Sequence, residues 1–167
     1  MNFLAKLKVR FSGKGPEHLR RGKLGERAAK KYLQRQGMKF LTANYRSERG
    51  EIDLIFRVND RPLAERHILP KLLKMRRLKF TGNDTYCLVF VEVKARSSEE
   101  WTRPAAAVNA ERRRRLTRAA LDYLRLLRNP PVKLRFDIVE VLLCDGAVRE
   151  VRHLPNTFPM ERPYRYG

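Results

Sequence analysis

The chain has 167 residues, which suits one ordinary domain with its own hydrophobic core and is short for two. Lysine and arginine number 38 against 18 aspartate and glutamate, so the formal charge at pH 7 is +20 and the isoelectric point is near 10.8. Such a charge makes the compact state repel itself, and its common use is attraction to polyanions. Nucleic acid is therefore the first partner to consider, and an anionic membrane surface is the second.

Several classes of protein are disfavoured by what the sequence lacks. The longest apolar stretches, CLVFV and IVEVLL, fall short of the ~18 residues of a membrane span, so we expect no stable membrane insertion. The basic start, MNFLAKLKVRF, lacks the apolar core and small-residue cleavage site of a secretion signal. No hydrolase triad or GxxxxGK phosphate loop occurs. Cys87 and Cys144 form no CxxC pattern, which predicts two buried thiols in a reducing cytoplasm.

The chain begins with a basic lead-in and one amphipathic helix. Residues 1–17 offer few apolar side chains, so we expect a flexible segment there. Between residues 19 and 36 the apolar residues recur at helical spacing, which predicts a helix. Glu26 is in register with Leu33, and two interpretations of it stay open. It is either an acid that leans toward the packed side or an exposed acid paired with Lys30 one turn later.

Strands follow, with an insertion between two of them. MKFLTANYRS predicts a strand and a turn, and GEIDLIFRV alternates so that Ile52 and Leu54 share one face while Asp53 and Ile55 share the other. Residues 59–86 interrupt the pattern with two prolines, a TGND turn and the basic stretch KLLKMRRLKF. They predict a basic insertion between the two strands of a hairpin. The next stretch, CLVFVEVKA, is the strongest predicted strand.

The second half of the chain predicts a long helix and a pair of strands. A polar loop, SSEEWTRPA, leads into a helix over residues 104–127, whose apolar stripe includes Leu116 and Leu124. VKLRFDIVEVLL predicts a strand, CDGA a turn, VREVRHL a strand, and the tail PNTFPMERPYRYG is too rich in proline to be regular. This order predicts one α/β domain over residues 18–158, a mixed sheet flanked by helices, with residues 159–167 as a tail.

Glu92 and Lys94 carry the first hint of chemistry, because residues two apart on a strand project to the same side, ~7 Å from each other. A buried acid needs a partner or a metal, so an internal ion pair is one interpretation. If the strand of Asp53 pairs with theirs, two carboxylates converge and form the hard oxygen ligands that Mg²⁺ accepts. Such a metal polarises a phosphoryl oxygen and activates water, while the lysine neutralises developing charge.

Arginines supply a basic surface around this strand. Arg112 stands at helical spacing with Val108 and Leu116, but the run RRRR over residues 112–115 winds around the helix. We expect one or two of its members to face a site and the rest to form a solvated surface that contacts phosphate backbones at most. For contact with nucleic acid we single out four residues: Arg46, Arg96, Arg112 and Arg113.

Six stretches occur in a recognisable succession: GERAAKKYL, NYRSERGEIDLI, VFVEVKARS, PAAAVNAERRRRLTRAALDYL, RFDIVEV and HLPNTF. This succession resembles the YraN family, a widespread family of uncharacterised bacterial proteins. Members are similar to archaeal Holliday junction resolvases and to the PD-(D/E)xK nuclease superfamily. The resemblance covers residues 21–158 without the insertion, and GEIDL followed by VEVK is much rarer than either motif alone. It implies a restriction-endonuclease-like fold.

The resemblance also implies roles for individual residues. Asp53 and Glu92 would bind Mg²⁺ or Mn²⁺, and Lys94 would be the catalytic lysine. The backbone carbonyl of Val93 would be a further metal ligand, and Glu26 would be a helix-borne acid near the site. Junction-resolving relatives work as dimers, so the resemblance implies a homodimer.

The chain departs from the family pattern at two places. The hairpin between the two acidic motifs is usually short, whereas here it holds the basic insertion. Arg112 stands where many members carry a lysine. The first departure leaves the acids in place and adds basic charge near the substrate, and the second changes a substrate contact without removing the acids.

The charge, the motifs and the resemblance are compatible with three functions. The leading expectation is a cytoplasmic, metal-dependent endonuclease that hydrolyses phosphodiester bonds in DNA, with branched or junction DNA among its substrates. The alternative is a non-catalytic nucleic-acid-binding protein that retains the nuclease fold. A third is a basic protein whose insertion and N-terminal stretch engage anionic lipid. The complete acid, acid, lysine set favours the first over the second, because a binder has no chemical reason to bury it.

Overall fold

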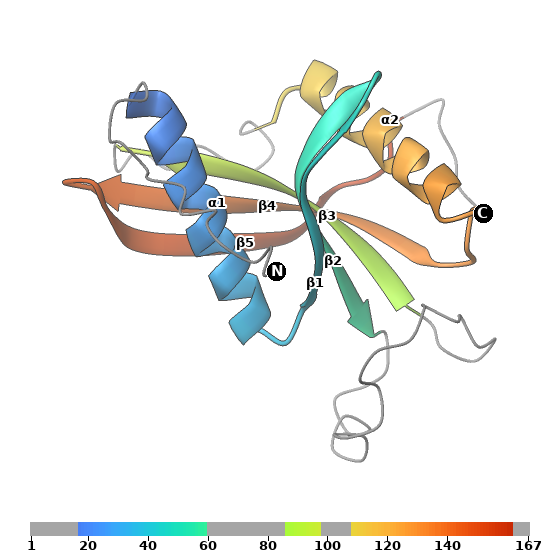
Figure 1. Ribbon diagram of the computed structural model, residues 1–167, viewed down its shortest axis with the longest axis horizontal. Coiled ribbons are helices and arrows are strands. Elements are labelled where there is room, and N and C mark those ends of the chain that lie inside the picture. The colour runs from blue at the N-terminus through green and yellow to red at the C-terminus, as the bar shows by residue number, and fades with distance from the viewer. Residues whose placement is uncertain (1–16, 60–85, 98–107, 162–167) are drawn as a thin grey trace, which may run out of the picture.

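The computed structural model describes residues 17–59, 86–97 and 108–161, and Figure 1 shows their arrangement. The elements are, in chain order, α1 (Glu17–Arg35), β1 (Lys39–Ser47), β2 (Gly50–Asn59), β3 (Tyr86–Arg96), α2 (Ala110–Leu126), β4 (Lys133–Cys144) and β5 (Ala147–Phe158). The strands form one five-stranded sheet in the order β1-β2-β3-β4-β5, in which only β3 and β4 are parallel. The predicted α/β class, a restriction-endonuclease-like mixed sheet with helices, is confirmed.

The two helices cover opposite faces of the sheet. α2 packs its buried stripe, with Leu116 and Leu124, against a core that includes Phe90 of β3. α1 packs against the neighbouring residues Val89 and Val91, which point to the other face because side chains alternate along a strand. We call these the α2 face and the α1 face. Among the described helices, none is both long and apolar enough to cross a membrane.

β2 does not keep the strict alternation that the sequence predicts. Its pairing with β3 ends at Leu54, which lies opposite Val91. Ile52 packs with Ile55 on the α2 face, whereas Leu54 packs on the α1 face, so the prediction that Ile52 and Leu54 share a face is wrong. The physical reason is that β2 leaves β3 at this point while it stays paired with β1, so the β1–β2 hairpin can twist away from the rest of the sheet. Asp53 lies next to the last residue paired with β3, on the side of the hairpin tip.

The segment between β2 and β3 connects two paired strands. Asn59 and Tyr86 are paired neighbours on antiparallel strands, so the segment between them joins two strands of a hairpin. The segment itself, residues 60–85, lies outside the described residues. So do the lead-in (residues 1–16), the loop before α2 (residues 98–107) and the end of the tail (residues 162–167). What the sequence predicts for these four segments therefore stays a prediction.

α2 begins later than predicted. Val108 and Asn109 are not helical, so a helix starting at residue 104 is wrong. The helix starts at Ala110 because the side chain of Asn109 accepts a hydrogen bond from the backbone N–H of Arg112 at 2.8 Å. Such a cap satisfies one of the free N–H groups of a first turn. It also fixes the direction in which Arg112 leaves the helix.

β5 extends through PNTF to Phe158, although the sequence predicts that this stretch is irregular. Asn156 takes a φ of 51°, and its N–H donates to Oδ1 of Asp137 at 2.9 Å instead of to the ladder. The register shifts there, and Phe158 pairs with Phe136, with ring centroids 5.0 Å apart. A side-chain hydrogen bond and a stacked aromatic pair thus continue the strand past its proline.

The cysteines differ from each other. Cys87 is buried as predicted, but Cys144 is exposed, so the prediction of two buried thiols is wrong for Cys144. The reason is its place at the end of β4, next to the turn formed by Asp145 and Gly146. These two residues have φ values of 50° and 75°, which is the two-residue hairpin turn that CDGA predicts.

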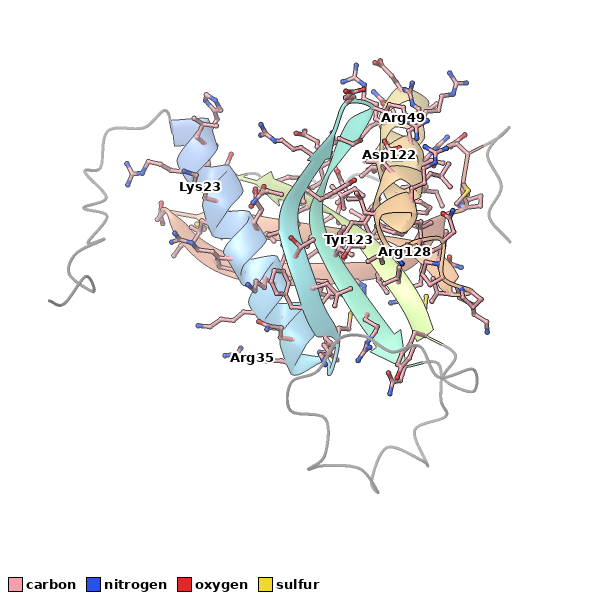
Figure 2. The ribbon with its side chains drawn as sticks, turned by 45° about the vertical axis from the view of Figure 1, so that its right-hand side comes forward. Lys23, Arg35, Arg49, Asp122, Tyr123 and Arg128 are labelled. Carbon is pink, nitrogen blue, oxygen red and sulfur yellow. The ribbon has the colours of Figure 1, made fainter. Side chains whose placement is uncertain are left out.

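The tip of the β1–β2 hairpin is bound to α2 by an ion pair. Arg49 donates through Nε to Oδ2 of Asp122 at 3.0 Å, and Figure 2 shows the two side chains together at the top of the molecule. The hydrogen bond from Arg49 lowers the pKa of Asp122. A Cβ at Gly50 would clash with the backbone oxygen of Arg115, so only glycine lets the strand come this close. The hairpin tip and α2 are thereby held side by side.

α1 approaches β3 with similar closeness at Gly25. A Cβ added there would lie 2.8 Å from Cβ of Ala95 and 3.7 Å from Cγ1 of Val93. Glycine within a helix costs roughly 0.5–1 kcal/mol relative to alanine. The close approach explains why the helix carries glycine at this position, and it presses the first half of α1 onto the C-terminal end of β3.

Gly25→Ala and Gly22→Ala test this contact, because both change glycine to alanine in α1 but only Gly25 faces a neighbour within 4 Å. We expect Gly25→Ala to lower the free energy of unfolding by roughly 1–3 kcal/mol through overpacking. Gly22→Ala should raise it by roughly 0.5–1 kcal/mol through helix propensity. Urea denaturation measures both. The pair Gly25→Ala/Ala95→Gly should be less destabilised than the two single variants added together, and equal effects of the two glycine changes would contradict the packing argument.

Candidate functional site

The site lies where β2 parts from β3. Beyond Leu54 the two strands no longer pair, and Oδ2 of Asp53 accepts a hydrogen bond from the backbone N–H of Val93 at 2.7 Å. A side chain thus bonds a main-chain group at the point where the neighbouring strand has left. This bond holds Asp53 beside Glu92, the residue before Val93.

Glu92 and Lys94 lie together on the α2 face of β3. Glu92 is only 3% exposed, and Nζ of Lys94 lies 2.9 Å from its Oε1. Phe90 is on the same face, which confirms the predicted alternation along this strand. The buried carboxylate therefore has a cation within hydrogen-bonding distance, as a buried acid requires.

Arg112 brings a second cation to Glu92 from the first turn of α2. Its Nε lies 3.0 and 3.1 Å from the two carboxylate oxygens of Glu92, and its Nη2 lies 2.8 Å from Oε2. Nη1 donates to Oε1 of Glu51 at 3.1 Å, and Nη2 lies 4.0 Å from Oδ1 of Asp53. Burial lowers the pKa of Arg112, but the hydrogen bonds and charge of Glu92 outweigh it and raise the pKa. Arg112 is thus the member of the arginine run that faces the acids.

Asp53 lacks enough positive charge around it. Its pKa is raised from 3.8 to about 7, first by burial and then by the negative charge of Glu92. The hydrogen bond from Val93 and the charge of Arg112 act in the opposite direction without cancelling this rise. Two carboxylates that compete for the same cations are typical of functional sites.

Glu26 reaches the edge of the site from α1. Nδ2 of Asn44 donates to its Oε2 at 3.1 Å, and the charge of Glu26 contributes to the raised pKa of Asp53. Lys30 lies instead over the ring of Phe40, 3.5 Å from its centroid. The structure therefore favours the first of the two interpretations of Glu26, the acid that leans toward the packed side.

The other arginines singled out for nucleic acid lie around the site. The side chain of Arg46 is 78% exposed, with Nε 3.7 Å from Oε2 of Glu51. Arg113 turns away from the acids and binds Glu161 at 2.5 Å. Arg96 is half-buried at the end of β3. Contact of these residues with nucleic acid stays a prediction, as do the catalytic roles of the acids and the metal contact of Val93.

Sequence reasoning missed Glu140. It lies on β4 directly beside Lys94 in the parallel pairing and is completely buried. Within the described part of the chain, neither of its carboxylate oxygens has a hydrogen-bond partner. The only signal in the sequence is one acid inside the apolar run IVEVLL, and nothing in that run shows which strand lies alongside.

A different buried acid, Asp137, accounts for the polar residues in two of the stretches singled out in the sequence, RFDIVEV and HLPNTF. Arg135 donates to its two oxygens at 2.8 and 2.9 Å, and Nε2 of His153 lies 2.8 Å from Oδ2. The N–H of Asn156 donates to Oδ1 at 2.9 Å. This fully satisfied carboxylate ties RFD of β4 to HLPN of β5. It is a structural clamp, in contrast to the acids of the site.

The oxygens of the site fit a hard divalent cation. Asp53 and Glu92 offer the carboxylates that Mg²⁺ and Mn²⁺ prefer. The raised pKa of Asp53 and the unbonded oxygens of Glu140 both indicate a deficit of positive charge. Among the described residues, no group of three or more His, Cys, Asp or Glu side chains is arranged to hold a metal. Waters and substrate phosphates would therefore have to supply the remaining ligands.

Asp53→Asn tests the electrostatics of the site through stability. Because the folded-state pKa lies above the ordinary 3.8, the contribution of Asp53 to stability is present below about pH 4 and is lost as the pH rises through 7. Asparagine removes the charge and keeps an acceptor for the N–H of Val93. We expect the variant to exceed the wild type by roughly 1–3 kcal/mol at pH 9 and to match it near pH 4, as measured by urea denaturation.

Glu150→Gln is the matched control for this experiment, because Glu150 is an exposed acid on β5. Its effect on the free energy of unfolding, measured at pH 4 and at pH 9, should be small. A stability difference for Asp53→Asn that stays constant over the same range would contradict the raised pKa.

Known proteins resemble this chain in sequence. Residues 25–141 match the family model described as uncharacterised protein family UPF0102. A UPF0102 protein of Trichlorobacter lovleyi is 32% identical over 148 residues, covering 89% of this chain and 95% of the relative. Similar proteins of Syntrophus aciditrophicus and Coxiella burnetii are 35% and 33% identical, covering 76% and 81% of this chain and 80% and 89% of the relatives. The chain therefore belongs to the UPF0102 family, which is the YraN family that its motifs resemble.

Proposed function

We propose that this protein is a metal-dependent endonuclease that hydrolyses phosphodiester bonds in DNA, with branched and junction DNA among its substrates. One observation carries the proposal: Asp53, Glu92 and Lys94 come together at the point where β2 leaves β3. The formal charge of +20 supports a polyanionic substrate. A homodimer and a cytoplasmic location belong to the same proposal.

Asp53 and Glu92 would hold Mg²⁺ or Mn²⁺, together with the backbone carbonyl of Val93. When bound, the metal supplies a Lewis acid that polarises a phosphoryl oxygen and lowers the pKa of a coordinated water. The bond from the N–H of Val93 orients the Asp53 carboxylate in advance. Glu26, within electrostatic reach of Asp53, adds negative charge that favours a cation at this place.

Lys94 and Arg112 act on the substrate side of the same acids. The ammonium of Lys94 can donate to a water or to a phosphoryl oxygen, where it stabilises the charge that develops in hydrolysis. The guanidinium of Arg112 offers a planar fork that matches a phosphate group as well as a carboxylate. Both cations now bind Glu92, so each can exchange a carboxylate for a phosphate when DNA arrives.

A second function, a nucleic-acid-binding protein that cleaves nothing, is favoured by one specific observation. Arg112 already occupies both oxygens of Glu92, and Lys94 adds a third contact to Oε1. A site whose acid is neutralised by the protein's own cations has less need of a metal. The basic surface would serve either function equally well.

Cleavage of labelled linear, flapped and four-way DNA, with RNA counterparts, in Mg²⁺ or Mn²⁺ decides between the two functions. We expect Asp53→Ala and Glu92→Ala each to lower the cleavage rate on the order of 100-fold or more, while DNA binding without metal survives. Glu150→Ala removes an exposed acid away from the site and should cleave like the wild type. Full activity in both site variants would refute the site, and a wild type that cleaves none of the substrates would favour the binding protein.

A further inference from the structure

A basic hollow lies beside the first half of α1, apart from the acids. It encloses about 910 Å³. Four basic residues of α1 line one side of it, and Ser97 and the β4–β5 turn line the other. The basic residues are Arg20, Arg21, Lys23 and Arg27. Asp145 is the one acid among the lining residues that the structure describes, so the hollow has an excess of positive charge.

The hollow connects to the acids through β3. Ser97, which accepts a hydrogen bond from Nη1 of Arg21 at 3.1 Å, stands three residues after Lys94. Because extended chain rises about 3.3 Å per residue, the hollow begins about 10 Å beyond the lysine. Successive phosphates on one strand of B-DNA are 3.4 Å apart along the helix axis. A strand whose phosphate lies at the acids would thus reach the hollow about three nucleotides later.

A smaller hollow, of about 390 Å³, adjoins the acids directly. It is lined by residues of the β1–β2 hairpin tip and of α2, among them Arg46, Glu51, Arg112 and Arg115. Glu51 and Arg112 also belong to the cluster around Glu92. The smaller hollow is therefore continuous with the cluster on the α2 face, whereas the hollow beside α1 lies past the end of β3 on the α1 face. Lys23 on α1 lines the first hollow and Arg49 at the hairpin tip lines the second, and Figure 2 shows the two side chains far apart.

We propose that the hollow beside α1 binds the phosphate backbone of nucleic acid and holds the part of the substrate that runs beyond the acids. A strand that contacts the smaller hollow, the acids and the hollow beside α1 in turn is an internal stretch of a chain, which is what an endonuclease needs. This inference rests on the proposed function, because the course of the DNA strand from the acids to the hollow assumes that the acids contact the substrate. Phosphate binding in the hollow does not itself require cleavage.

The test compares Arg20→Gln/Lys23→Gln with Lys31→Gln/Arg35→Gln. Both pairs remove two exposed positive charges from α1, but only the first pair lines the hollow. Binding of a labelled 20-base-pair DNA duplex is followed by fluorescence anisotropy, in EDTA and over a range of salt concentrations. Each lost phosphate contact lowers the slope of log affinity against log salt by about 0.9. We expect the first pair to lower it by about 1.8 and the second to leave it unchanged.

Equal slopes for the two pairs would overturn the hollow as a phosphate site. So would an unchanged slope together with lost binding to phosphatidylserine vesicles, because that outcome assigns the hollow to a membrane surface. The measurement contains no metal, so a protein that fails to cleave DNA but shows the difference in slope keeps the hollow and loses only the proposed activity.

A second inference starts from Glu140, which the hollow does not involve. Its cross-strand neighbours on the two adjacent strands are Lys94 and Arg152. Nη2 of Arg152 lies 3.7 Å from Glu150, and the Lys94 ammonium bonds Glu92. Among the described residues, Glu140 is therefore left buried with two unbonded oxygens. A buried carboxylate without a partner is costly unless another state of the protein supplies one.

We infer that Glu140 positions Lys94 by offering its ammonium a second place when Glu92 binds a divalent metal. Neighbouring strands lie about 4.8 Å apart, so the flexible four-carbon stem of Lys94 can reach either carboxylate by rotation alone. The move relieves two problems together, since it removes one of the two cations at Oε1 of Glu92 and pairs Glu140. This inference rests on metal binding at Glu92 and not on cleavage.

A double-mutant cycle with Mn²⁺ tests the inference, using calorimetric titration of the full chain. We expect Glu140→Gln to weaken Mn²⁺ binding on the order of 10-fold, because the ammonium then stays on Glu92. In the Lys94→Gln background, the same change at Glu140 should have no further effect. Circular dichroism verifies that each variant is folded, and glutamine keeps the size of the buried side chain.

The outcomes separate the inference from the function on which it rests. If the wild type binds Mn²⁺ and Glu140→Gln weakens binding equally in both backgrounds, the positioning role of Glu140 is refuted alone. If the wild type binds no Mn²⁺, the metal-dependent function is refuted and the role of Glu140 with it.

Discussion

The hydrogen bond from the N–H of Val93 to the carboxylate of Asp53 joins the fold to the chemistry of the site. A strand that leaves its neighbour uncovers main-chain groups, and a buried N–H without a partner is costly. The sheet meets this requirement with an acid, at 2.7 Å, where another residue of β2 would otherwise continue the ladder. The same bond that completes the sheet therefore sets a carboxylate beside Glu92. The gap between the strands admits Arg112 from one face and the charge of Glu26 from the other.

Two kinds of buried acid in one small domain show how structure and function divide. Asp137 accepts hydrogen bonds from Arg135 and Asn156 and contacts His153, so all of its bonding capacity serves to hold β4 to β5. At the site, Glu92 has two cations, Asp53 has a raised pKa and Glu140 has no partner in the described residues. Stability alone would favour spreading the cations evenly. An uneven distribution is what a site retains when it awaits a charged ligand.

The sequence predicts those parts of the site that depend on local periodicity. The alternation along β3 places Glu92 and Lys94 on one face. Helical spacing indicates that Arg112 faces the apolar side of its helix, and its guanidinium contacts Glu92. Contacts that depend on strand order are not readable from periodicity. β3 and β4 are parallel neighbours separated by a whole helix, so no local pattern sets Glu140 beside Lys94. The change of face in β2 around Asp53 escapes prediction for a related reason, because the ladder between β2 and β3 ends there while the ladder between β2 and β1 continues.

Arginine in place of lysine at position 112 changes how metal and substrate binding are linked. A lysine would make one contact with Glu92, whereas the guanidinium holds both oxygens and also reaches Glu51. A metal at Glu92 must therefore displace a bidentate partner, which weakens metal binding in the free protein. A guanidinium displaced from Glu92 would need another anion. A phosphate of the substrate supplies that anion, so under the proposed function DNA and metal bind more tightly together than either does alone.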